Sequence, residues 1–485
     1  MSYESYETVI GLEVHVQLAT RSKAFCGDDA SFGGEPNTHV STISLGHPGT
    51  LPRLNKRQIE FAVRLGLALN SDINLMSTFD RKNYFYADLP KGYQITQDRK
   101  PVCVGGYLML PLSGEREGGR KKIRIHHIHM EEDAGKSMHD ADPKDSLIDL
   151  NRAGVPLLEI VTEPDLRSAD EVDAFMSAMR QLVRYLEISD GNMEEGSMRC
   201  DCNVSVRKKG ETQLNNRCEI KNVNSMRFAR RAIEYEVKRQ IDIMESGGTV
   251  EQQTLNFDPE TGITTPLRSK EDAQDYRYFP EPDLPPVIIT PTYLENIKSD
   301  LAPLPWALHE HLITQFSLPE YDVNLLTEEK ATALFFLELA KHDTNYKAIS
   351  NLIINKILPW CQEQKLEIEQ FPVGFKQLAT FIQLIEEGKV SNSNAYQRIF
   401  PQLTAQPERS ALEIAQELNL IQTSDEDFLE KIVDEVLAKN PTKVAEYQKG
   451  KKGLLGFFVG EVMRQSKGKA EPKITNALLI KKLDS

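Results

Sequence analysis

Cysteine is scarce in this sequence, and long apolar runs are missing. Six cysteines in 485 residues are too few for a disulfide framework, which favours a reducing compartment. No apolar run approaches the about 20 residues of a membrane-spanning helix, and the N-terminus lacks the basic region and apolar stretch of a signal peptide. These absences predict a cytoplasmic protein that does not act in a membrane.

A net positive charge is missing as well. The chain carries a formal charge of −14, which argues against a protein that coats nucleic acid without specificity. Residues 439–485 differ, because they hold eleven Lys and Arg against four Asp and Glu. This local excess favours a contact with a polyanion, and a solvated helical surface is an equally good interpretation.

Strand patterns dominate the first part of the chain, and helical patterns dominate the rest. Within the first part, apolar residues at helical spacing predict helices over 168–188, where Ser168 and Glu171 have the spacing of a capping box, and over 225–247. The prolines of 279–286 exclude regular structure there and indicate a boundary. We therefore expect domains at 1–292, 293–403 and 404–485.

One strand with two chemically different faces is predicted near the N-terminus. Between residues 9 and 18, apolar residues alternate with others, so that Glu13 and His15 share one face. A solvent face usually carries Lys, Thr or Ser, so this pair indicates a site. An ordinary solvated face is the alternative.

A second strand of this kind is predicted over 198–207. Cys200 and Cys202 fall on its apolar face, and no second pair follows at zinc spacing, so buried core cysteines are a better interpretation than a metal site. Arg199 and Asp201 fall on the polar face, and Glu194 precedes the strand. The polar face therefore carries charges of both signs.

A third strand is predicted over 123–133, and it ends in three acids. If it is extended, Glu131 shares a face with His127 and His129, whereas Glu132 lies on the other. Adjacent carboxylates repel one another unless a cation or solvent relieves them, and oxygen ligands suit Mg²⁺ beside nucleotide phosphates. An exposed acidic turn is the alternative.

The Gly135-Lys136-Ser137 sequence is not a phosphate-binding P-loop, since that motif needs a glycine where this chain has Met130. A nucleotide site has to be of another kind. Residues 79–86 offer one, because Lys82 can neutralise phosphate and aromatic residues such as Tyr84 can stack on adenine. A partly buried strand has the same pattern.

Seven stretches, in order along the chain, resemble one known family. They are YETVIGLEVH at 6–15, DRKNYFY at 80–86, HMEEDAGKS at 129–137, DLNRAGVPLLEIV at 149–161, MEEGSMRCD at 193–201, DYRYFPEPD at 275–283 and GFFVGEVMR at 456–464. The family they resemble is the B subunit of the bacterial and organellar aspartyl/glutamyl-tRNA amidotransferase. The resemblance covers essentially the whole chain, and the ordered set is highly specific.

The resemblance implies a fold, a reaction and partners. The implied fold is α+β: a cradle domain with a mainly antiparallel sheet and flanking helices, then a helical domain and a small helical tail that binds tRNA. The implied reaction uses ATP to phosphorylate the side-chain carboxylate of Glu-tRNA(Gln) or Asp-tRNA(Asn). Ammonia, made from glutamine by a partner amidase, then gives the amide. That amidase, the A subunit, and a small C subunit complete the expected heterotrimer.

The resemblance also implies roles for residues in the matching stretches. Mg²⁺ is expected at Glu13, His15, Glu131, Glu132 and Glu194, Asp201 is a further catalytic candidate, and Lys82, Tyr84 and Arg199 are expected to face ATP. The sequence leaves open which of Glu131 and Glu132 reaches the metal. It also leaves open whether the aspartyl route, the glutamyl route or both are used.

One departure from the family concerns zinc. Many members bind zinc through a Cys-x-Cys pair followed by a Cys-x-x-Cys pair, but this chain keeps only Cys26, with Asp28, Ser41 and Ser44 at the other places. One thiolate does not complete a four-ligand site. We therefore expect no zinc, and a loop over 25–52 that holds its shape by packing alone.

Three other functions fit the residues less well. A nonenzymatic tRNA-binding scaffold with a decayed site is disfavoured by the intact set of charged residues. An archaeal-type glutamyl-tRNA amidotransferase subunit is disfavoured because the chain has no spare length for an inserted synthetase-like domain. An amidase is disfavoured because no Ser-rich nucleophile motif with a nearby Lys is present.

Overall fold

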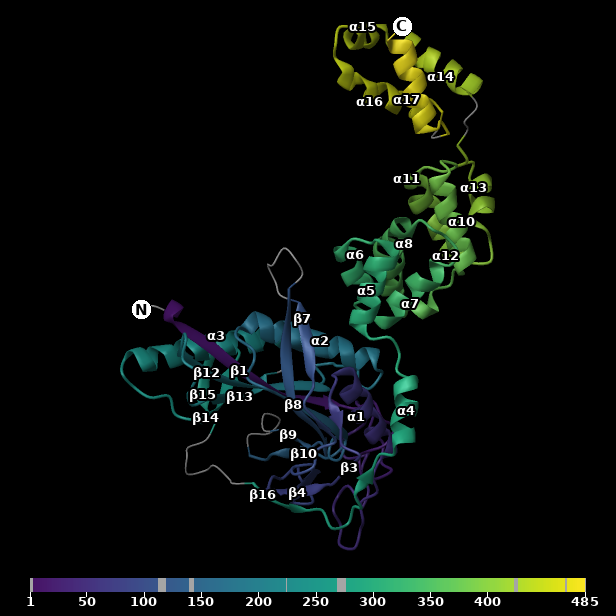
Figure 1. Ribbon diagram of the computed structural model, residues 1–485. Helices are drawn as coiled ribbons and strands as arrows, with labels where there is room; N and C mark the ends of the chain where they lie inside the picture. Colours follow the sequence, from purple (N-terminus) through teal and green to yellow (C-terminus); the bar gives the residue numbers. More distant parts are fainter. Residues whose placement is uncertain are drawn as a thin grey trace. The chain divides into compact units, whose positions relative to one another are not determined.

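The computed structural model describes residues 3–111, 119–138, 144–223, 225–267, 276–422, 426–466 and 469–484 (Figure 1). Asp275, the first residue of one family stretch, and Lys467 of the basic tail lie outside the described residues. The chain divides into two compact units, Met1–Ala307 and Leu308–Ser485. Among the described residues, no helix is both long and apolar enough to cross a lipid bilayer.

Unit 1 consists of strands with a few helices. The strands are β1 Tyr6–Gln17, β2 Asp72–Ile73, β3 Met76–Ser77, β4 Asp80–Asn83, β5 Tyr93–Thr96, β6 Cys103–Val104, β7 Tyr107–Pro111, β8 Arg120–Glu132, β9 Lys136–Met138, β10 Leu147–Asp149, β11 Pro156–Thr162, β12 Met198–Lys208, β13 Cys218–Val223, β14 Gln253–Asp258, β15 Ile263–Pro266, β16 Arg277–Pro280 and β17 Val287–Ile288. The helices are η1 Tyr3–Ser5, α1 Lys56–Ala68, α2 Ala169–Tyr185, α3 Met226–Glu245 and α4 Pro291–Ser299.

One ten-stranded sheet organises unit 1. Its order is β15-β14-β13-β12-β1-β11-β8-β6-β2, and β7 pairs with β8. The pairings are antiparallel apart from that of β13 with β14. Alternation in β1, β8 and β12 fixes the register, because a slip of one residue turns the apolar set to the other face. The predicted α+β fold with a mainly antiparallel sheet is confirmed.

The hydrophobic core of unit 1 lies on one face of this sheet. Ile10, Leu12, Val14 and Val16 of β1 are at most 1% exposed and join one apolar cluster with residues of α1, α2 and α3. In Figure 1, α2 and α3 lie on one side of the sheet, and β4 and β16 lie on the other. The polar side chains of the sheet therefore face away from the core.

The two helices predicted in this part of the chain are confirmed. Ser168 is the N-cap of α2, and its hydroxyl accepts a hydrogen bond from the Glu171 amide (3.2 Å). The Glu171 carboxylate accepts from the Arg167 amide (2.6 Å), so the predicted capping box forms with its acidic half displaced by one residue. Ser225 caps α3 in the same way.

The prediction that 279–286 has no regular structure is wrong at its start. Arg277–Pro280 forms β16, the edge strand of a three-stranded sheet in the order β16-β4-β5. Pro280 ends this edge strand, a position where proline is tolerated. The register places Tyr278 opposite Lys82, and this pair bears on the site below.

Unit 2 is helical. Its elements are α5 Pro305–Phe316 (which begins in unit 1), α6 Glu320–Leu326, α7 Lys330–Leu339, α8 Tyr346–Leu352, η3 Ile353–Ile357, α9 Leu358–Gln364, η4 Ile368–Gln370, α10 Phe375–Glu386, α11 Asn392–Asn394, η5 Ala395–Ile399, α12 Phe400–Ala405, α13 Ala411–Glu417, α14 Glu426–Lys439, α15 Pro441–Gln448, η6 Lys452–Leu454, α16 Leu455–Gln465 and α17 Pro472–Leu483. Its hydrophobic cores comprise buried residues of 312–420 and of 429–483. The predicted domain bounds stay predictions.

The loop over 25–52 is held by hydrogen bonds as well as by packing. Ser44 Oγ donates to Asp28 Oδ2 (2.5 Å), and the Ser41 amide donates to Ser44 Oγ (2.9 Å). Burial raises the pKa of the Cys26 thiol to about 11. The expectation that packing alone holds this loop was therefore wrong, because the three residues that replace the family's cysteines bond to one another. The absence of zinc stays a prediction.

Candidate active site

The polar face of the large sheet brings predicted residues from several strands into one row. In the strand register, His15 on β1 lies opposite Glu159 on β11 and Arg199 on β12. Glu159 in turn lies opposite His129 on β8. Side chains at opposed positions point to the same face. The row therefore reads Arg199, His15, Glu159 and His129 across the sheet.

A first cluster consists of His15, Glu131 and Glu159, whose ligand atoms all lie within 4.8 Å of one another. His15 Nε2 lies 3.2 Å from Glu159 Oε2 and 3.8 Å from Glu131 Oε1. His129 Nε2 lies 3.3 Å and 3.6 Å from the same two carboxylates. Two carboxylates and an imidazole that converge in this way are a donor set for a divalent cation.

The histidines and carboxylates of this cluster stabilise one another's charges. Although burial opposes it, Glu159 and Glu131 raise the pKa of His129 to about 10 and also raise that of His15. Despite its burial, the two imidazolium groups hold the pKa of Glu159 well below its usual range. Burial and the neighbouring His129 lower the pKa of His127 to about 4. The two carboxylates, Glu131 and Glu159, therefore favour positively charged groups beside them.

A second cluster consists of Glu13, Asp201 and Glu219, whose ligand atoms also lie within 4.8 Å of one another. Lys221 Nζ lies 3.2 Å from Asp201 Oδ2 and 2.7 Å from Glu219 Oε1. Burial, followed by the charges of neighbouring carboxylates, raises the pKa of Glu13. Three carboxylates against one ammonium group leave an excess of negative charge, which suits a second cation.

Two basic side chains lie beside these clusters. Arg199 Nη2 donates to Asp133 Oδ2 (2.7 Å), whereas its Nε is buried without a partner in the described part of the chain. A buried unpaired donor is costly, and an incoming phosphate oxygen is a suitable acceptor for it. Although burial opposes it, the charge of Glu131 raises the pKa of Lys82. Both groups therefore present positive charge to the site.

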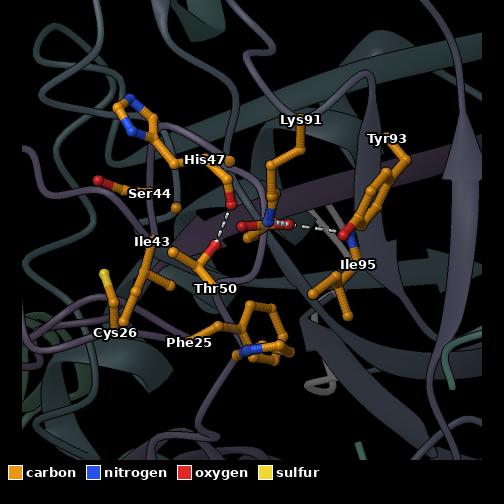
Figure 2. A pocket seen from close by; sticks show the side chains of 13 residues that line it. Phe25, Cys26, Ile43, Ser44, His47, Thr50, Lys91, Tyr93 and Ile95 are labelled. Carbon is orange, nitrogen blue, oxygen red and sulfur yellow. Dashed lines mark hydrogen bonds and ion pairs between the residues drawn. The ribbon is translucent and has the colours of Figure 1, made fainter. Parts of the chain in front are cut away.

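Glu132 faces the opposite way from Glu131, as the alternation of β8 predicts. Its carboxylate pairs with the Lys91 ammonium group and accepts from the Ile95 amide (2.9 Å). Figure 2 shows Lys91, Tyr93 and Ile95 around the pocket on that side, which has a volume of about 100 Å³. Ligand pockets are commonly roughly 300–1,000 Å³, so this one is too small for a nucleotide. The metal-binding role of Glu132 stays a prediction.

Two further predicted residues do not join either cluster. Glu194 is exposed in the turn before β12, where its amide donates to Asn192 Oδ1 (3.0 Å). No contact of its carboxylate with either cluster is found among the described residues. The Tyr84 ring centre lies 5.9 Å from Lys82 Nζ, and burial raises the pKa of Tyr84. The roles of Glu194 and Tyr84 stay predictions.

Glu159 and Glu219 were not predicted as site residues. Glu159 carried a signal, because it is the single charged residue of strand β11, whose other residues are apolar apart from Thr162. Glu219 and Lys221 alternate with the buried Cys218 and Ile220 of β13. Glu159 could therefore have been predicted as a charge that interrupts a short buried strand. Glu219 could have been predicted from the period-two alternation of its strand.

The fold and the two clusters define the class of the protein: an α+β unit whose sheet carries a site rich in carboxylates and imidazoles, followed by a helical unit. The family described as "GatB/GatE catalytic domain" matches residues 8–295, and that described as "GatB domain" matches residues 334–483.

Curated relatives match over the full length. The chain is 48% identical over 483 residues to the B subunit of the aspartyl/glutamyl-tRNA(Asn/Gln) amidotransferase of Myxococcus xanthus, with 100% of both chains covered. It is 47% identical to the proteins of the same name from Salinibacter ruber (100% of this chain, 98% of the relative) and Thermodesulfovibrio yellowstonii (98% and 99%). The chain belongs to the family of aspartyl/glutamyl-tRNA(Asn/Gln) amidotransferase B subunits.

Proposed function

We propose that this chain is the ATP-using subunit of a glutamine-dependent tRNA amidotransferase. It phosphorylates the side-chain carboxylate of Glu-tRNA(Gln) or Asp-tRNA(Asn) and amidates it to give Gln-tRNA(Gln) or Asn-tRNA(Asn). The names of the relatives support amide transfer on tRNA. The observation that carries the phosphorylation step is the convergence of two carboxylate clusters with Lys82 and Arg199 on one face of the sheet.

The chemistry explains why such a site needs positive charge. A carboxylate resists nucleophilic attack because it is already anionic. In the proposed reaction, one of its oxygens attacks the γ-phosphorus of ATP, and ADP leaves. Ammonia then attacks the acyl carbon, and inorganic phosphate leaves with that same oxygen. Lys82 and the unpaired Nε of Arg199 offset the negative charge that gathers on the phosphoryl oxygens.

The donor sets also fit Mg²⁺. His15, Glu131 and Glu159 would hold one ion, and Glu13, Asp201 and Glu219 would hold another. Bound there, Mg²⁺ supplies positive charge to phosphate oxygens. Its ligands would need their free lone pairs, so His15 would bind it as the neutral imidazole.

We propose a cytoplasmic heterotrimer with the amidase A subunit, which makes ammonia from glutamine, and the small C subunit. The relatives are described as B subunits, which supports a multisubunit complex. Because ammonia has to travel uncharged, a closed passage from the partner amidase is expected rather than attack by ammonia from bulk water.

The assembled complex tests this proposal when it is given ATP, ammonium chloride and each misacylated tRNA. Wild type should release phosphate in step with amide formation. Glu13→Gln should bind tRNA normally and lose phosphate release, because it removes a carboxylate ligand of the second ion. The matched control is Glu7→Gln, since Glu7 lies on the same face of β1 but bonds to Arg207 (2.9 Å); it should turn over normally.

Two outcomes would contradict the proposal. Full turnover by Glu13→Gln would remove the metal assignment. Binding of misacylated tRNA by wild type without any phosphate release would favour the nonenzymatic scaffold.

A further inference from the structure

Two tyrosines form a rim beside Lys82. Tyr278 on the edge strand β16 lies opposite Lys82 in the register. The ring centre of Tyr276, just before this strand, lies 4.6 Å from Lys82 Nζ and 5.5 Å from the ring centre of Tyr84. Tyr276 and Tyr278 remain 47% and 43% exposed. They therefore present aromatic surface next to a cation of the site.

The small sheet that carries this rim contacts the first cluster directly. β5 is the other neighbour of β4, and Thr96 at its end donates from Oγ1 to Glu131 Oε2 (3.3 Å). Gln94 of β5, which lies opposite Lys82, donates from Nε2 to the Glu132 carbonyl oxygen (2.6 Å). The tyrosine rim and Glu131 are therefore fixed relative to each other by one small sheet.

We propose that Tyr276 and Tyr278 bind the 3′-terminal adenosine of the misacylated tRNA by stacking on its base. This inference rests on the proposed function and names the part of the substrate that the rim receives. Aromatic side chains stack on nucleic-acid bases through their π-faces. A half-exposed pair on an edge strand is accessible to a single-stranded RNA end, which is too bulky to enter a buried pocket.

The length of the amino acid favours the tRNA end over ATP as the source of the adenosine. A glutamyl side chain separates the ester carbon from the carboxylate carbon by four bonds of about 1.5 Å each, or about 5 Å when extended. A carboxylate held beside Lys82 and Glu131 therefore keeps the esterified nucleoside at the rim of the site. The adenine of ATP is separated from the reacting phosphorus by the ribose and two further phosphates, and so lies farther away.

Kinetics of the heterotrimer with ammonium chloride as nitrogen donor distinguish the two sources of adenosine. Tyr276→Ala and Tyr278→Ala should each raise the KM for misacylated tRNA about tenfold and leave the KM for ATP unchanged. Tyr276→Phe and Tyr278→Phe, which keep the ring, should behave as wild type. Phe279→Ala is a matched control, because Phe279 lies on the same strand, is 45% exposed and faces Arg81 instead.

Two kinetic outcomes would overturn the inference. A higher KM for ATP with an unchanged KM for tRNA would assign the rim to the adenine of ATP. If both alanine variants keep the wild-type KM for tRNA and for ATP, the rim binds neither adenosine. Thermal unfolding of the exposed-site alanine variants should match that of wild type.

A binding measurement without ATP separates this inference from the proposed function. Wild type should bind uncharged tRNA about tenfold more tightly than the same tRNA lacking its 3′-terminal adenosine. Tyr276→Ala should bind both RNAs with equal affinity, namely the affinity of wild type for the RNA that lacks its terminal adenosine. If wild type does not discriminate between them, or if Tyr276→Ala discriminates as wild type does, the rim does not bind this nucleoside. Neither result depends on whether ATP is hydrolysed.

Discussion

At the residue scale, the adjacent carboxylates of Glu131 and Glu132 on β8 have different neighbours. Glu131 approaches His15 and His129 in the first cluster. Glu132 instead pairs with Lys91, and the two side chains are only 4% and 13% exposed. Because a buried ion pair that loses one partner leaves an uncompensated charge, its disruption typically costs about 3–5 kcal/mol. The two glutamates should therefore differ in what they contribute.

We expect Glu132→Gln to lower the free energy of unfolding by an amount near the lower end of that range, because the Lys91 ammonium loses its carboxylate. Glu131→Gln should cost less stability, because Glu159 remains beside both His15 and His129, but it should abolish phosphate release. Chemical denaturation and phosphate release of both variants measure this difference. The reverse pattern would move the metal-binding role from Glu131 to Glu132.

The alternation of side chains within each strand made it possible to predict which site residues share a face of that strand. Alternation alone placed Glu13 with His15, Arg199 with Asp201, and Glu131 apart from Glu132. Which strands become neighbours depends on tertiary pairing, and no local pattern specifies that β1 lies between β11 and β12. The cluster with Glu159 and the second cluster with Glu219 therefore emerged only from the sheet order.

At the element scale, the structure gives Gly135 a role that involves no phosphate. A Cβ at this position would lie 2.9 Å from the carbonyl oxygens of both Asp88 and Asp149. The Gly135 amide donates to the Asp88 carbonyl oxygen (2.8 Å), and its own carbonyl accepts from Arg152 Nη2 (2.6 Å). The glycine between β8 and β9 is therefore required by the close approach of three backbone segments.

Gly135→Ala should lower the free energy of unfolding by about 1–3 kcal/mol, the usual cost of forcing extra atoms into a well-packed place. Gly27→Ala is the control, because a Cβ at Gly27 meets nothing within 4 Å. Denaturant titration of both variants measures the effect. Equal stability of the two variants would show that the backbone around Gly135 relaxes without cost.

Helices and long strands were predictable at this scale because their apolar spacing extends over several turns or repeats. The short edge strand β16 was not predictable, because the prolines in its segment, taken alone, predict irregular structure. Its pairing with β4 joins residues almost 200 positions apart in the chain, and Tyr278 meets Lys82 only through that contact. The aromatic rim was therefore invisible in the sequence.

At the scale of the whole molecule, the basic excess of residues 439–485 is partly neutralised within the fold. Lys451 pairs with Glu446, Lys452 with Asp484, and Lys482 with Asp434. Lys449 is exposed, and its ammonium group has no ion-pair partner in the part of the chain that the structure describes. Part of the charge counted in the sequence is therefore committed to intramolecular ion pairs, which are worth little at an exposed surface.

Replacing Lys449, Lys451 and Lys452 with Ala should raise the KM for misacylated tRNA and flatten its dependence on salt, because each lost phosphate contact reduces the number of released counterions. Lys341→Ala, between α7 and α8, removes an exposed lysine paired with Glu338 and serves as a control of similar exposure. Steady-state kinetics over a salt series measure the slope. A slope equal to that of wild type would mean that this surface of the tail does not contact the RNA.

The fate of one oxygen atom tests the central claim most directly. Glu-tRNA(Gln) or Asp-tRNA(Asn) labelled with ¹⁸O in the side-chain carboxylate is incubated with the complex, ATP and ammonium chloride, and the phosphate is analysed by mass spectrometry. If the site activates the carboxylate by phosphorylation, each phosphate formed with an amide carries one ¹⁸O atom from the labelled position. Amide formation accompanied by unlabelled phosphate would contradict the account.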